Sequence, residues 1–292
     1  EPPTEPPPTE PPPTEAPPPP TPVPIGPGRI AYTEGESGAA EIVVIDADGD
    51  GRLKLTDNSY YDGEPDWSPD GSLIAFESAP AGDIDIYVMN ADGAGIRRLT
   101  TTTGADRHPD WSPDGSLIAY ESGEGSTIEL YVINADGSGR RRLTNNGYGD
   151  RAPKFSPDGS QLAYMTRARG KWEIAIMDFA SGDVVEIFDC PAPDCRFPSW
   201  SPDGSKIAFN TLDSAGGVDD IWVLEVVTGD PEPLTSGSQN GRPVWSGDGH
   251  YIFFNSTEDR ALDIYRLDLR TGEFERITTR SGDEYAPDWG PG

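Results

Sequence analysis

Short apolar runs alternate with polar turns rich in glycine, proline and aspartate along residues 29–292. In one representative stretch, strands are expected at 64–67, 73–78, 85–90 and 96–100. The later runs are rich in β-branched and aromatic residues, and the Ser-Pro-Asp-Gly segment at 68–71 separates the first two. Proline presets φ at the second turn position and glycine accepts a positive φ, so this segment predicts a tight hairpin turn. The pattern therefore predicts four short antiparallel strands joined by turns.

This four-strand unit repeats along the chain. An aromatic residue preceded two positions earlier by proline marks each copy: Trp67, Trp111, Phe155, Trp200, Trp245 and Trp289. A strand-rich repeat of about 40–50 residues is typical of a β-propeller, in which each repeat forms one blade of a ring. We expect the repeated aromatic residues to pack blade against blade.

The two ends of the repeat array complement each other. Three strands are expected at 29–34, 41–46 and 52–56, with no aromatic strand before them, and one aromatic strand at 285–289 has nothing after it. Joining the two sets completes a sixth blade and removes both open sheet edges. The predicted fold is all-β: a six-bladed propeller of four-stranded antiparallel blades, closed by one C-terminal and three N-terminal strands.

The repeated motif resembles that of the TolB-type β-propeller family, with its Pro-x-Trp-Ser-Pro-Asp-Gly turn and a following strand like Ile86-Tyr87-Val88. The resemblance covers nearly everything after residue 28. Departures are local, since Phe155 replaces a tryptophan and Ser246-Gly247-Asp248-Gly249 lacks the proline. Members of this family include the periplasmic Tol–Pal component, propeller domains of prolyl-peptidase-like enzymes and some pectin lyases. The resemblance thus implies the fold and leaves several functions open.

Residues 1–28 form a segment of different composition, which holds 15 of the 31 prolines. Proline fixes φ and lacks an N–H, so this segment is expected to be a polyproline II arm and not helix or sheet. The chain is therefore divided into an arm, 1–28, and a propeller, 29–292. The prolines expected to mediate assembly through this arm are Pro6, Pro7, Pro8, Pro11, Pro12 and Pro13.

Two non-catalytic functions compete on this basis. In the first, the arm docks in the propeller of another copy, which gives a head-to-tail contact that propagates as a filament. In the second, the arm is a stalk for a monomeric propeller at the cell surface or in the periplasm, which binds a protein or glycan partner. The first is preferred from the sequence. A polysaccharide lyase-like enzyme is the third possibility.

The formal net charge is −29, and about −25 of it remains when the four glutamates of residues 1–28 are set aside. Such a surface repels nucleic acid, and no run approaches the roughly 18 apolar residues of a membrane span. Nucleic acid and direct membrane insertion are therefore not expected. Four arginines are expected around one mouth of the channel, where they bind an acidic ligand or pair with neighbours such as Asp106 and Asp150: Arg107, Arg151, Arg196 and Arg242.

The chain has two cysteines, Cys190 and Cys195, with four residues between them. A disulfide that closes this loop is the favoured interpretation, with free thiols or a metal site as alternatives. Disulfides persist in oxidising compartments. The pair therefore favours a location outside the cytoplasm, whether extracellular, at the cell surface or periplasmic.

One segment has the spacing of a calcium-binding loop, with Asp46, Asp48, Asp50 and Asp57 at oxygen-ligand positions and Gly51 at the sixth. The same repeat position elsewhere holds plain turns, Asn90-Ala91-Asp92-Gly93 among them. Calcium is therefore possible here, and a structural turn is the preferred interpretation. No other cofactor is expected.

Catalytic signatures are absent from the sequence. The Gly-x-Ser-x-Gly pentapeptide that marks the serine hydrolase nucleophile does not occur. The two histidines, His108 and His250, are expected in loops and not in a catalytic or metal site. We therefore expect the protein not to be an enzyme.

Overall fold

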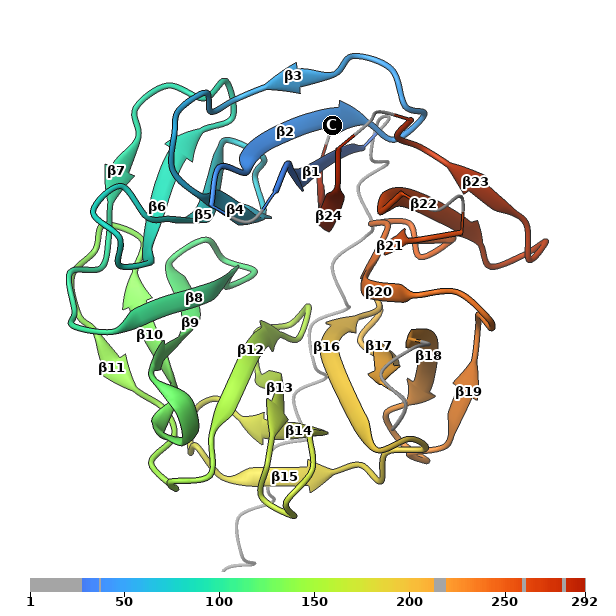
Figure 1. The fold of residues 1–292 in the computed structure, drawn as a ribbon. Helices are drawn as coiled ribbons and strands as arrows, with labels where there is room; N and C mark the ends of the chain where they lie inside the picture. The colour runs from blue at the N-terminus through green and yellow to red at the C-terminus, as the bar shows by residue number, and fades with distance from the viewer. Residues whose placement is uncertain (1–27, 37, 213–218, 259–260, 280–281, 292) are drawn as a thin grey trace, which may run out of the picture.

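The computed structural model describes residues 28–36, 38–212, 219–258, 261–279 and 282–291. These residues form six four-stranded antiparallel sheets arranged in a ring, which confirms the six-bladed propeller (Figure 1). The expected arm at 1–28, including its six assembly prolines, lies outside the described residues except for Gly28. The division into arm and propeller therefore stays a prediction. No helix in the described ranges is long and apolar enough to cross a membrane.

Each blade runs from an inner strand beside the channel to an outer strand at the rim (Figure 1). The inner strands are β4 (Asp62–Trp67), β8 (Ala105–Trp111), β12 (Asp150–Phe155), β16 (Asp194–Trp200), β20 (Asn240–Trp245) and β24 (Glu284–Gly290). The second strands are β5 (Leu73–Ser78), β9 (Leu117–Gly123), β13 (Gln161–Thr166), β17 (Lys206–Leu212), β21 (Tyr251–Ser256) and β1 (Arg29–Glu34). The third strands are β6 (Asp85–Asn90), β10 (Glu129–Asn134), β14 (Glu173–Asp178), β18 (Asp219–Glu225), β22 (Asp263–Asp268) and β2 (Glu41–Asp46). The outer strands are β7 (Arg97–Arg98), β11 (Arg141–Arg142), β15 (Val184–Ile187), β19 (Pro231–Pro233), β23 (Phe274–Arg276) and β3 (Leu53–Lys54). A 3-10 turn, η1 (Gly125–Thr127), lies between β9 and β10.

The ring closes as expected, by pairing of the two chain ends. Strand β24 pairs with β1 in the antiparallel sense, with Arg29 opposite Gly290 and Ile30 opposite Trp289. The sixth blade therefore has the order β24-β1-β2-β3. Because both strands are satisfied within this blade, neither chain end of the array leaves an open inner edge.

The outer strands are shorter than expected, because a side chain replaces part of their backbone ladder. In the β4–β7 blade, the N–H of Leu99 donates to the carbonyl of Ile86, and the N–H of Ile86 donates to Thr100 Oγ1 at 3.0 Å. The same threonine contact recurs at Thr56, Thr144, Thr235 and Thr278. The regular backbone pairing of the outer strand therefore ends early. The N–H groups of the third strand remain hydrogen-bonded, because the threonine hydroxyl accepts in place of a backbone carbonyl.

The core lies between neighbouring blades. Trp111 of β8 is only 6% exposed and packs with Ile86, Val88 and Leu99 of the preceding blade and Ile118 of its own. Equivalent clusters surround the other repeated aromatic residues. The aromatic series therefore joins each blade to the next, as its recurrence predicts.

Candidate functional site

The six inner strands are bulged at the same point, and this bulge shapes the channel. The residue three before each aromatic has φ between +46° and +53°: Glu64, His108, Ala152, Phe197, Arg242 and Ala286. Each precedes a proline. A positive φ is uncommon for residues other than glycine and is stable only where the surroundings hold it.

Side chains of the preceding blade hold the bulges in place. The N–H of His108 donates to Glu77 at 2.8 Å, and the N–H of Ala152 donates to Glu121 at 2.9 Å. Both carboxylates lie on second strands and are about 1% exposed. Since each bulge frees an N–H from the ladder, these acceptors replace the lost hydrogen bonds.

The bulge residues, their prolines and four side chains farther along the inner strands enclose a small cavity in the channel. Its volume is about 70 Å³. Pockets for organic ligands usually have roughly 300–1,000 Å³. The cavity is therefore suited to waters or a single small group and is too small for an organic substrate.

An ion cluster forms one layer of this cavity. Lys154 Nζ lies 2.6 Å from a carboxylate oxygen of Asp66 and 2.9 Å from one of Asp110. The other oxygens of these carboxylates accept the N–H groups of Trp111 and Phe155 in the following blades. Each aspartate thus joins two blades, and the single positive charge of the lysine offsets part of their negative charge.

Burial governs the protonation of this layer. It raises the pKa of Asp110 to about 7 although the Lys154 ammonium opposes the shift. Burial also raises the pKa of Asp288, whose carboxylate accepts the N–H of Trp67 at 2.8 Å. Burial lowers the pKa of Lys154, but Asp110 and Asp66 outweigh it and raise that pKa overall. The lysine therefore stays charged at neutral pH.

The ion cluster was missed at the sequence level. Asp66, Asp110 and Asp288 stand directly before an aromatic residue in three repeats, and Lys154 takes that place in a fourth. Aligning the repeats on the aromatic residue would have shown one lysine among three aspartates. The ring brings these equivalent positions together at the channel. The lysine in place of an aspartate was therefore the feature of the sequence that could have predicted the ion cluster.

A second network lies at the bulge layer, nearer the mouth where the inner strands begin. His108 Nδ1 lies 3.1 Å from a carboxylate oxygen of Glu121, and Nε2 lies 3.9 Å from one of Glu64. Glu64 also pairs with Arg242, whose guanidinium lies 4.1 Å from the ring centroid of Phe197. The loop position expected for His108 is therefore wrong, since the histidine lies within β8 and lines the cavity.

The electrostatics of His108 follow from these neighbours. Burial lowers its pKa, but the carboxylates of Glu121, Glu64 and Glu77 outweigh that effect and raise the pKa overall. Burial raises the pKa of Glu77 to about 7. The second histidine, His250, lies in an exposed turn beside Asp248, where a loop was expected.

All four arginines expected at the mouth lie on inner strands. Arg107 pairs with Glu77 at 3.6 Å and Arg196 with Asp194 at 3.0 Å, while Arg242 pairs with Glu64. Arg151 lies 5.4 Å from the ring centroid of Trp172. The expected partners differ, because Asp106 accepts from Thr102 and Asp150 from Thr166. A ligand-binding role for these arginines stays a prediction.

Of the four aspartates expected as calcium ligands, Asp46, Asp48 and Asp50 lie at the turn after β2, and Asp57 lies beyond β3. The N–H of Asp50 donates to Asp48 at 3.1 Å, as the N–H of Ala94 does to Asp92 in the next repeat. Asp57 pairs with Lys54 at 2.6 Å, and Asp46 lies 3.5 Å from Arg29. Across the described ranges, no three His, Cys, Asp or Glu side chains are grouped to hold a metal ion. These side chains contact protein groups, and a calcium site at this loop stays a prediction.

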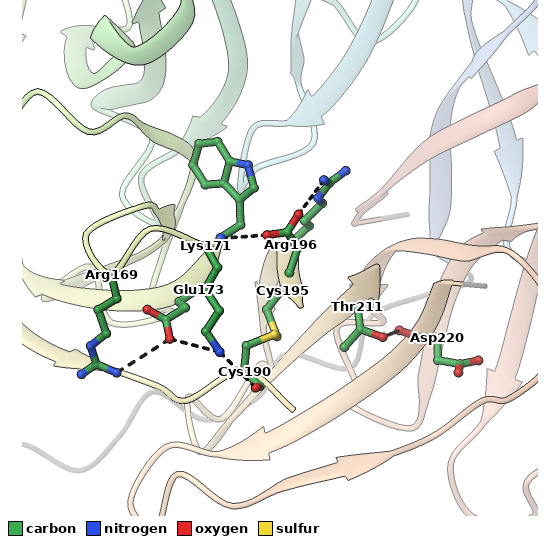
Figure 2. Close-up of a disulfide and its surroundings, with 10 residues drawn as sticks. Arg169, Lys171, Glu173, Cys190, Cys195, Arg196, Thr211 and Asp220 are labelled. Atoms are coloured by element: carbon green, nitrogen blue, oxygen red, sulfur yellow. Dashed lines mark hydrogen bonds and ion pairs between the residues drawn. A yellow bond between two sulfur atoms is a disulfide. The ribbon is translucent and has the colours of Figure 1, made fainter. Parts of the chain in front are cut away.

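Cys190 and Cys195 form a disulfide, with their Cα atoms 5.7 Å apart (Figure 2). Cys195 lies on β16 next to Arg196, and its N–H donates to the carbonyl of Trp172. In other blades, hydrogen bonds such as that from Thr102 to Asp106 join the two sides of this loop. The disulfide covalently fixes the same connection, at the edge of the channel mouth.

Reduction of this disulfide is expected to lower the free energy of unfolding by about 2 kcal/mol, because the crosslink restricts a short loop of the unfolded chain. Urea unfolding with and without dithiothreitol measures the difference. The double variant Cys190→Ala, Cys195→Ala is the control and should not respond to dithiothreitol. Equal stability of the oxidised and reduced wild type would contradict the expectation.

Stability is expected to rise as the pH falls from 8 to 6. Glu77 and Asp110 have a pKa of about 7 in the fold, well above the ordinary values near 4. A group with a raised folded pKa binds its proton more tightly when folded, so its stabilisation is present below pH 4 and is lost through pH 7. We expect a gain on the order of 1 kcal/mol for each group between pH 8 and 6.

Urea unfolding across pH 3 to 9, in steps, tests this expectation. Hydrogen bonds lower the pKa of turn aspartates such as Asp70 and Asp114, so their stabilisation is lost as the pH falls through their low folded pKa. The curve should therefore have its maximum on the acidic side of neutrality. A stability that is flat or increasing from pH 6 to 8 would show that the two carboxyls titrate normally.

Comparison with known proteins agrees with this geometry. The family model of the TolB beta propeller domain matches residues 24–190 and 152–292. A Tol-Pal system protein TolB from Francisella tularensis is 37% identical over 49 residues, which cover 17% of this chain and 11% of that protein. The matched segment is thus a small part of this curated relative.

Solved structures show the same fold. TolB from Acinetobacter baumannii superposes with a TM-score of 0.81 at 22% identity, over 90% of this chain and 66% of that one. Hydrazine synthase from Kuenenia stuttgartiensis superposes with a TM-score of 0.76 at 14% identity, over 91% of this chain and 47% of that one. At these identities the likeness concerns the fold alone. On the family match, the chain belongs to the TolB beta propeller domain family.

Proposed function

We propose that this propeller is a non-catalytic module that binds a partner protein at the channel mouth where the inner strands begin. The observation that carries the proposal is the composition of that mouth: Arg107, Arg151 and Arg196 stand around it on a chain with a net charge of −29. Arginine and aromatic side chains are enriched in protein interfaces. The likeness to Tol-Pal system proteins supports a protein partner.

Two features support a non-catalytic role. The channel cavity, at about 70 Å³, has no room for an organic substrate. The carboxylates around it are occupied by structural contacts, since Asp66, Asp110 and Asp288 each accept a backbone N–H from another inner strand. The polar groups of the channel therefore hold the ring together.

The disulfide Cys190–Cys195 supports a location outside the cytoplasm, such as the periplasm, because such bonds persist in oxidising compartments. We propose that the propeller acts as a monomer and that residues 1–28 serve as a spacer. The head-to-tail filament through Pro6–Pro8 and Pro11–Pro13 has no observation in its favour among the described residues. The stalked, partner-binding form is therefore the one proposed.

Site-specific photo-crosslinking tests the proposal. A photoreactive amino acid is placed at Arg107, at the mouth, or at Val227, which is 96% exposed in the β18–β19 turn. After incubation with an envelope extract of the source cells, the mouth position should give a discrete crosslinked band and the turn position should not. Bands of equal strength at both positions, or none at the mouth, would contradict binding there.

A further inference from the structure

A basic sector interrupts the acidic surface where the β12–β15 blade meets the β16–β19 blade. It is formed by Arg151 on β12, the β13–β14 hairpin with Arg167, Arg169 and Lys171, and Arg196 at the start of β16. Several of these charges are neutralised. Arg169 lies 2.8 Å from Asp189. Glu173 lies 3.8 Å from Arg169 and 3.6 Å from Lys171, and Arg196 pairs with Asp194 (Figure 2).

Arg151 and Arg167 are different. The guanidinium of each lies 5.4 Å from the ring centroid of Trp172. Within the ranges that the structure describes, neither is within ion-pair distance of a carboxylate. Arg151 Nε is buried and has no hydrogen-bond acceptor. The outer Nη atoms of Arg151 are not among such buried atoms, so an incoming acceptor reaches the guanidinium through them.

An acidic neighbour, Glu121, does not satisfy Arg151. Glu121 interacts electrostatically with Arg151, but its carboxylate already contacts His108 Nδ1 at 3.1 Å and accepts the N–H of Ala152 at 2.9 Å. Both of those partners belong to the bulge layer of the channel. The positive charge of Arg151 therefore remains available on the mouth side.

Trp172 is held rigidly by the neighbouring blade. Its main-chain N–H donates to the Asp194 carboxylate at 2.9 Å, and its main-chain carbonyl accepts the N–H of Cys195 at 2.8 Å. Because Cys195 is also part of the disulfide, the main chain under the indole is fixed on both sides. The aromatic platform that carries the two guanidinium groups is thus preorganised.

We infer that Arg151, Arg167 and Trp172 form a binding site for a glutamate or aspartate side chain in an extended acidic segment of the partner protein. This inference rests on the proposed function. Guanidinium groups bind carboxylates through paired hydrogen bonds, and the outer nitrogens of Arg151 and Arg167 are the donors that a carboxylate meets here. The rest of the propeller carries a net negative charge, which repels an acidic segment elsewhere on the surface. The site therefore also fixes which residue of the partner segment lies at this sector.

The test measures binding of a synthetic acidic peptide by calorimetry. The probe is an eleven-residue peptide of alternating glutamate and serine, and its glutamine counterpart is the negative control. Wild type should bind the glutamate peptide, and the variant Arg151→Gln, Arg167→Gln should bind it about tenfold more weakly or worse, because two charged contacts are lost. No binding by the wild type, or equal binding by both proteins, overturns the inference.

A matched variant controls for net charge. Arg97→Gln, Arg141→Gln removes the same two charges from the outer strands β7 and β11 and should bind like the wild type. A loss equal to that of the Arg151 and Arg167 variant would show a general charge effect and overturn the site. Unchanged thermal unfolding of both variants excludes misfolding.

Two further measurements identify the source of the acidic segment and separate this inference from the proposed function. Residues 1–15 of the chain carry four glutamates and no basic residue. If that peptide binds the site and the wild type self-associates in sedimentation, the segment comes from the chain and a partner protein is not the ligand. If the Arg107 crosslink survives in Arg151→Gln, Arg167→Gln, the proposed function stands and the acid site does not.

Discussion

Replacement of Lys154 by methionine is expected to lower the free energy of unfolding by about 3–5 kcal/mol at pH 7.5, since one partner of a buried ion cluster is removed. Asp66 and Asp110 then remain in the channel without the ammonium that lies 2.6 and 2.9 Å from them. Their carboxylates cannot turn away, because each also accepts a backbone N–H from the next blade. Urea unfolding followed by tryptophan fluorescence measures the loss.

Lys206→Met provides the matched control. Lys206 pairs with Glu225 at 2.7 Å, but both side chains are more than 40% exposed, so its loss should cost no more than about 1 kcal/mol. Asp66→Asn, Asp110→Asn in the Lys154→Met background should recover much of the stability, because the uncompensated charges are gone. If Lys154→Met is as mild as Lys206→Met, the lysine does not stabilise the ring.

Replacement of Trp111 by alanine is expected to cost about 3–5 kcal/mol, because it leaves a cavity between two blades. Trp111 is 6% exposed and packs with Ile86 and Leu99 across the blade junction. The neighbouring blades cannot collapse onto the space, since the closed ring fixes their separation. Thermal and urea unfolding should both show the loss.

Trp111→Phe should be milder than Trp111→Ala, because Phe155 occupies the same repeat position in β12. Val227→Ala is the surface control, since Val227 is 96% exposed, and should change stability by less than about 0.5 kcal/mol. A cost for Trp111→Ala below about 1 kcal/mol would mean that the blade junction does not depend on the indole.

The mouth of the channel shows where sequence interpretation reached its limit. The repeat placed Arg107, Arg151 and Arg196 at equivalent positions on inner strands, and the structure has them there. Their partners were assigned from nearby residues, Asp106 and Asp150, whereas Arg107 contacts Glu77 of the preceding blade. A neighbour in sequence on a strand points to the opposite face, so the partner came from another strand.

His108 shows the same limit from a different cause. His108 was expected in the loop just before the strand of Trp111; it precedes a proline, which lacks the N–H that a strand ladder uses. In the structure the bulge removes that requirement, and Glu77 of the preceding blade accepts the freed N–H of His108. The bulge depends on a side chain 31 residues away, which no local pattern reports.

The sequence alone determined the turns, the strands, the number of blades and the closure of the ring, because each follows from local residue chemistry repeated at a constant period. The pairing of β1 with β24 was implied by the complementary chain ends. The tertiary structure alone decided the contents of the channel. Lys154 meets Asp66 across 88 residues, and Arg242 meets Glu64 across 178. Such contacts exist only after six blades have closed, since curvature of the whole ring brings equivalent positions of separate repeats to one axis.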